Sequence, residues 1–117
     1  MCPDNPVWNL PEALFALARA GDESLVPEII AIFRDDTARR LTNLQQAFEA
    51  GDTSAVREQA HAIKGSAAQV GAASMASCCR EIECCAAGSR TTPLGPLVHQ
   101  LHRDFKEVCE AMARNYG

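Results

Sequence analysis

The chain has 117 residues and six cysteines, with a net charge of −4 and hydrophobic residues at 47% of its positions. This length suits a single domain with one hydrophobic core, spanning residues 1–117. The acidic balance argues against nucleic acid as a partner, because no basic stripe is present to neutralise a phosphate backbone. The sequence has no apolar run of about 18 residues and no signal-like N-terminus, so we expect a cytoplasmic protein that does not bind a membrane.

The predicted elements are all helices, because apolar residues recur at spacings of three and four and no strand pattern occurs. Asn9, Pro11 and Glu12 form a helix start, so we expect a short helix at about 10–19 that caps one end of the fold. Longer helices are predicted at about 24–50, 53–70, 73–87 and 94–115. Short connections between long amphipathic helices favour antiparallel neighbours, which predicts an all-α, up-down-up-down four-helix bundle.

The helix at 53–70 has an apolar stripe that predicts its buried face: Val56, Ala60, Ile63, Ala67 and Val70. At roughly 100° of rotation per residue, His61 points about 140° away from the centre of that stripe, Lys64 about 80° and Gly65 about 180°. The imidazole therefore faces solvent or a partner. A glycine within a helix costs roughly 1 kcal/mol relative to alanine, so we interpret Gly65 as open space beside the histidine.

The helix at 73–87 carries two cysteine doublets, Cys78-Cys79 and Cys84-Cys85. Cys78 and Cys85 are about 10 Å apart along a helix axis, which is beyond the reach of a disulfide. The doublets also lack the Cys-x-x-Cys spacing of a structural zinc site. We interpret the cysteines as free thiols that pack as small hydrophobes. The predicted inward stripe of this helix comprises Met75, Cys78, Ile82 and Cys85.

The segment His61-Ala62-Ile63-Lys64-Gly65-Ser66, followed by Gly71-Ala72, resembles the motif of histidine-containing phosphotransfer (HPt) domains of bacterial phosphorelays. The resemblance covers nearly the whole chain and includes Asp22, the Phe33 to Leu44 stretch, Ala47 and Gly51-Asp52. It implies that His61 accepts a phosphoryl group from an aspartyl phosphate on a receiver domain and passes it to another receiver aspartate. We expect a monomer whose partners are response regulator receiver domains and a hybrid histidine kinase.

The neighbours of His61 suit phosphoryl transfer, which depends on positioning and on charge neutralisation. An imidazole is substantially neutral and nucleophilic near physiological pH. Lys64, one turn on, is placed to neutralise phosphoryl oxygens, and Gly65 is placed to give a partner access. Gln69, two turns on, is a candidate to orient the imidazole or to donate to the phosphate. Ser66 lies toward the other side of the stripe and suits helix packing.

The sequence contains no P-loop, no Gly-rich ATP loop and no pair of carboxylates beside a nucleophile. We therefore expect a carrier protein without autokinase activity and without a cofactor or metal of its own. The resemblance implies that Mg²⁺ and an acidic pocket belong to the receiver partner.

Two other functions stay open from the residues alone. Glu58-x-x-His61 has the spacing of the Glu-x-x-His pairs in di-iron bundles, which would make the chain a metal-binding bundle. Such a site needs a second pair, and neither His99 nor His102 has a glutamate three residues before it. A passive protein-interaction bundle is the other alternative. Phosphate uptake from a phosphodonor, or bound iron or zinc, would distinguish these functions.

Overall fold

The computed structural model describes residues 25–88 and 94–116. These ranges contain four helices and no strand: α2 (Leu25–Glu49), α3 (Thr53–Val70), α4 (Ala73–Ala86) and α5 (Leu94–Tyr116). Each helix agrees with its predicted range to within one residue at either end. The short helix predicted at 10–19 lies outside the described residues.

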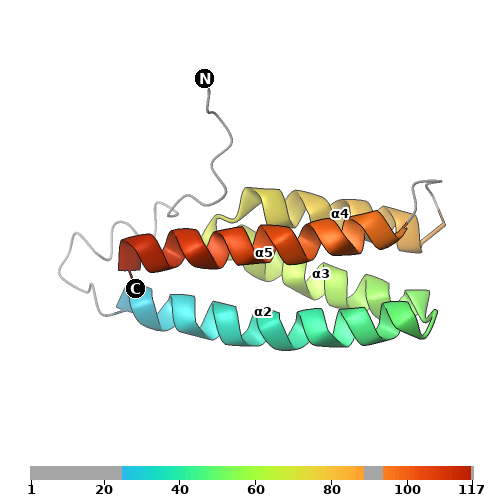
Figure 1. The fold of residues 1–117 in the computed structure, drawn as a ribbon, viewed down its shortest axis with the longest axis horizontal. Helices are drawn as coiled ribbons and strands as arrows, with labels where there is room; N and C mark the ends of the chain where they lie inside the picture. Colours follow the sequence, from blue (N-terminus) through green and yellow to red (C-terminus); the bar gives the residue numbers. More distant parts are fainter. Residues whose placement is uncertain (1–24, 89–93, 117) are drawn as a thin grey trace, which may run out of the picture.

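Successive helices run in opposite directions, so the chain goes up, down, up and down along the long axis of the molecule (Figure 1). α3 packs on α2, α4 packs on α3, and α5 packs on α4 and returns to α2. The Cα atoms of the diagonal pairs, α2 with α4 and α3 with α5, all lie more than 8 Å apart. The predicted four-helix bundle is confirmed, with α3 and α4 as adjacent antiparallel neighbours.

Both ends of α3 are fixed by local backbone chemistry. At its start, the Asp52 carboxylate accepts a hydrogen bond from the Ala55 N–H at 3.1 Å, which satisfies a donor that the first turn leaves unpaired. At its end, Gly71 has a φ of 82°, in the left-handed region that glycine adopts without steric cost. The Ala72 N–H then donates to the Ala67 carbonyl at 2.8 Å. The chain therefore reverses within two residues and enters α4 directly.

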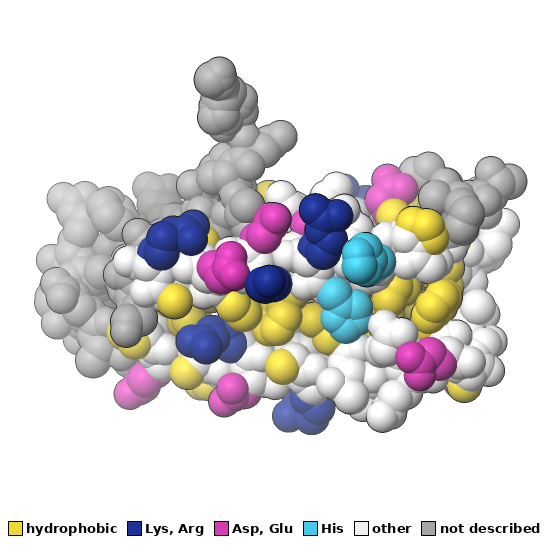
Figure 2. Space-filling model, in the orientation of Figure 1, with side chains coloured by type: hydrophobic (Ala, Val, Ile, Leu, Met, Phe, Trp, Pro, Cys, Tyr) yellow, Lys and Arg dark blue, Asp and Glu magenta, His cyan; other side chains and the backbone are white. Residues whose placement is uncertain are grey.

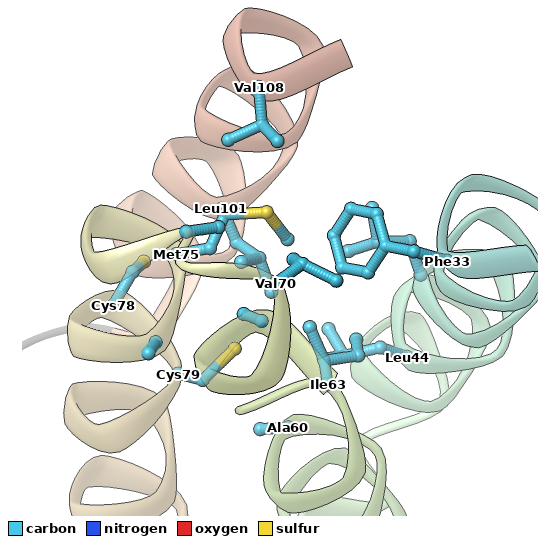
Figure 3. Packing of buried hydrophobic residues seen from close by; sticks show 14 of the residues in the cluster. Phe33, Leu44, Ala60, Ile63, Val70, Met75, Cys78, Cys79, Leu101 and Val108 are labelled. Atoms are coloured by element: carbon cyan, nitrogen blue, oxygen red, sulfur yellow. The ribbon is translucent and has the colours of Figure 1, made fainter. Parts of the chain in front are cut away.

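The core lies between the four helices, and Figure 3 shows side chains from all of them converging on it. The predicted stripe of α3 is confirmed, because all five of its members are buried. The predicted stripe of α4 is partly wrong: Cys79 is fully buried, whereas Cys85 is only half-buried. α4 packs against both α3 and α5, and its buried face therefore centres on Met75, Cys79 and Ile82 and leaves Cys85 at the edge.

None of the five described cysteines forms a disulfide: Cys78, Cys79, Cys84, Cys85 and Cys109. Burial raises the pKa of the Cys78 and Cys79 thiols to about 12. Both groups therefore stay protonated at neutral pH and fill space in the core as small hydrophobes.

The seam between α2 and α5 is lined with half-buried apolar side chains, which form a hydrophobic band flanked by charged residues in Figure 2. Phe33 and Phe105 meet across this seam edge to face, with ring centroids 6.2 Å apart. Asp104 of α5 is buried, with 7% of its surface exposed, and its Oδ1 accepts a hydrogen bond from the Gln100 amide at 2.8 Å. Burial raises the pKa of the Asp104 carboxyl above its ordinary value. None of the described helices is long and apolar enough to cross a membrane.

Candidate functional site

His61 stands on the outward face of α3, opposite the buried stripe that anchors the helix. Its side chain is 71% exposed, although a neighbouring carboxylate contacts the Nδ1 edge of its ring. Nδ1 lies 3.3 Å from Oε1 of Glu83, which projects from the adjacent helix α4. The histidine therefore combines a fixed ring orientation with access to solvent.

Glu83 also binds Lys64, so one carboxylate connects both residues of the motif. Lys64 Nζ lies 2.9 Å from Oε2 of Glu83, and the Lys64 side chain is 30% exposed against 19% for Glu83. Sequence reasoning did not identify Glu83, which follows His61 by 22 residues. The available signal was the two-residue turn at Gly71 and Ala72, because antiparallel helices joined by so short a turn place Glu83 roughly level with His61.

The electrostatics of Glu83 determine which ring nitrogen of His61 carries a proton. Burial raises the pKa of the Glu83 carboxyl, but the hydrogen bonds and charges of Lys64 and His61 outweigh it and leave the pKa below its ordinary value. The carboxylate is thus ionised at neutral pH and can only accept hydrogen bonds. Nδ1 must therefore be the donor, and the neutral ring keeps its lone pair on Nε2.

The two remaining predicted site residues lie on the same helix but do not touch the ring. Gly65 is exposed, and a Cβ added to it would meet no atom within 4 Å, so the surface beside His61 is open. Gln69 is also exposed, and it makes no hydrogen bond with His61 in the described structure. Glu83, and not Gln69, is the residue that holds the imidazole.

A surface depression adjoins His61 on the side of the α3 N-terminus. Its lining consists of Ser54, Arg57, Glu58, His61 and Glu83. Glu58 and His61, the pair that suggested a di-iron bundle, thus share a surface hollow and do not point into the core. Within residues 25–88 and 94–116, no three His, Cys, Asp or Glu side chains come together as ligands for a metal ion.

The chain matches known proteins at the level of family and of overall structure. A family model described as the Hpt domain matches residues 28–113, which include all of α3 and α4. The chain belongs to the Hpt domain family. It is similar to histidine-containing phosphotransfer protein B (HptB) from Pseudomonas aeruginosa PAO1, whose crystal structure matches with a TM-score of 0.80 and 28% sequence identity over 95% of each chain. A search of curated proteins found no match.

Membership in the Hpt family makes this protein a histidine phosphotransfer carrier of phosphorelays, a class that works with response regulator and kinase domains. Among the three histidines of this Hpt domain, His61 is the one that contacts a carboxylate, that of Glu83, which in turn pairs with Lys64. His102 Nε2 lies 3.0 Å from Gln45 Oε1 at a half-buried position on α5. His99 is exposed on the same helix.

Proposed function

We propose that His61 accepts a phosphoryl group from the aspartyl phosphate of one receiver domain and donates it to the aspartate of another. The observation that carries this proposal is the engagement of Nδ1 by the Glu83 carboxylate on a histidine whose side chain is 71% exposed. That arrangement leaves the Nε2 lone pair as the nucleophile. The Nε2–phosphorus bond is therefore the one that we expect to form.

The transfer step follows from the tautomer. The Nε2 lone pair attacks the phosphorus of the aspartyl phosphate, the P–O bond to the aspartyl carboxylate breaks, and this carboxylate leaves with the bonding electron pair. Nε2 carries no proton at the start, so no base is required. The ring gains positive charge, which the Glu83 carboxylate beside the Nδ1–H stabilises. Onward transfer is the reverse reaction with a different receiver aspartate.

The other motif residues have supporting roles in this proposal. Lys64 contributes positive charge near the phosphoryl oxygens while it remains paired with Glu83. Gly65 leaves room for the edge of the receiver's active site. Gln69 is exposed on the same side of α3 and is placed to contact a docked receiver. The Mg²⁺ that assists phosphoryl transfer belongs to the receiver, together with its acidic residues.

The test is phosphate uptake from a radiolabelled, phosphorylated receiver domain. The wild-type protein should acquire phosphate that is labile in acid and stable in alkali, as expected for phosphohistidine. His61→Gln should abolish uptake and change the free energy of unfolding by no more than about 0.5 kcal/mol, because the side chain is exposed. His99→Gln is the matched control and should take up phosphate normally.

Continued uptake by His61→Gln, or label on His99 or His102, would overturn the assignment. Bound iron or zinc in the purified protein would instead support a metal-binding bundle. A transfer profile against all receiver domains of the source organism then identifies the physiological donor and acceptor.

A further inference from the structure

Arg57 is a second cation beside His61 that the motif does not include. It lies one helical turn before His61 on α3 and lines the same depression. Side chains on a helix lean toward its N-terminus, so the His61 ring extends over the turn that carries Arg57. Arg57 is exposed, and it forms no ion pair with any residue of the described ranges.

Lys64 and Arg57 differ in whether their charge is already paired with a carboxylate of the described residues. Lys64 is paired with Glu83 at 2.9 Å, and its side chain is only 30% exposed. A phosphoryl group on Nε2 would add a charge of about −1.5 to −2 beside Glu83, with Glu58 also on the wall of the depression. The positive charge of Lys64, already paired with Glu83, would then be outweighed by two carboxylates and a phosphoryl group. This charge balance favours a second cation, and Arg57 is the one that lines the depression.

We infer that Arg57 binds the phosphoryl oxygens of phosphorylated His61 and holds the group over the depression between α3 and the end of α4. The inference rests on the proposed function of His61. An arginine suits this role because its planar guanidinium can donate two parallel hydrogen bonds to phosphate oxygens. In this arrangement Lys64 serves mainly to fix Glu83, while Arg57 contacts the transferred group.

The test uses the whole protein, phosphorylated with phosphoramidate, so that no receiver is needed. In that reaction the P–N bond of phosphoramidate breaks, ammonia leaves, and the phosphorus bonds to Nε2 of His61. Phosphorus NMR then follows the titration of the phosphoryl group between its monoanion and dianion in wild type, Arg57→Gln and Arg57→Lys. Arg103→Gln is the charge-matched control, because Arg103 is exposed on α5, whose Cα atoms all lie more than 8 Å from those of α3.

Loss of a guanidinium that binds the dianion should raise the titration midpoint of Arg57→Gln by about 0.2 to 0.7 pH units, a shift typical of exposed ion pairs. Arg57→Lys should restore much of the wild-type midpoint, and Arg103→Gln should match wild type. Equal midpoints in wild type and Arg57→Gln, or an equal shift in Arg103→Gln, would overturn the role of Arg57 alone. Failure of wild-type His61 to accept phosphate from either phosphoramidate or a receiver would overturn the proposed function as well.

Discussion

Replacement of Gly65 should move stability and function in opposite directions. Gly65 lies within α3, is exposed, and is not among the glycines with a positive φ. A Cβ at this position meets nothing within 4 Å, so alanine adds helix propensity without steric conflict. We expect Gly65→Ala to raise the free energy of unfolding by about 1 kcal/mol, which corresponds to a melting temperature higher by about 4 °C.

Under the proposed function, the same open space is where a receiver brings its aspartyl phosphate toward His61. A displacement of about 1 Å can reduce the rate of an in-line transfer by on the order of 100-fold. Gly65→Leu and Gly65→Gln should therefore fold well and transfer phosphate slowly, with Gly65→Ala intermediate. Melting temperature and the rate of transfer from a phosphorylated receiver are measured on the same preparations.

Gly95→Ala on α5 is the matched control. Its Cβ would make an ordinary contact of 3.5 Å with the Phe48 ring, and the Cα atoms of α5 all lie more than 8 Å from those of α3. It should leave the transfer rate unchanged. Wild-type transfer rates in Gly65→Leu and Gly65→Gln would refute the docking geometry. A lower melting temperature in Gly65→Ala would refute the structural account of the glycine.

Two further predictions concern charged groups. Lys64→Ala should slow phosphoryl transfer by up to about fivefold without abolishing it, because a partly exposed cation stabilises a nearby negative charge only modestly. An unchanged rate in stopped-flow transfer assays would exclude a role of Lys64 in transfer. Asp104→Asn should stabilise the protein at pH 7 and keep an oxygen that accepts from Gln100. Because the pKa of Asp104 is raised in the folded protein, its ionisation lowers the free energy of unfolding of the wild type as pH rises. The extra stability of Asp104→Asn over wild type should therefore shrink when denaturation is measured toward pH 4. A difference in stability that stays constant across this pH range would contradict the reasoning.

The parts of the structure that depend on local spacing could be predicted from the sequence. The helix boundaries and the buried stripe of α3 follow from apolar periodicity and from turn-forming residues such as Gly71. The outward direction of His61 follows from the same rotation, since a residue opposite a buried stripe faces solvent. The prediction that Cys85 belongs to the buried stripe of α4 is wrong, because the apolar pattern of one helix does not show which of its faces two neighbouring helices cover.

Glu83 could not be predicted from spacing along one helix, because its position depends on the packing of α4 against α3. Gln69 was a reasonable candidate to orient the ring on α3 alone, yet the adjacent helix supplies a carboxylate at 3.3 Å. The sequence does not single out Arg57 either, because an exposed arginine in a helix ordinarily has no specific role. Its proposed role depends on the depression that it shares with His61 and on the ion pair between Lys64 and Glu83.

The tight reversal at Gly71 also limits which insertions and deletions the segment between His61 and Glu83 can accept. With no loop to absorb an extra residue, the pairing of His61 with Glu83 depends on the number of residues between them. One inserted residue in α4 before Glu83 would rotate the carboxylate by about 100° and move it about 1.5 Å along the axis, so it would leave both His61 and Lys64. An insertion of seven residues would restore the rotation but displace the carboxylate by about 10 Å. Insertions and deletions between residues 61 and 83 should therefore separate Glu83 from His61 and Lys64 even where they leave the helices intact.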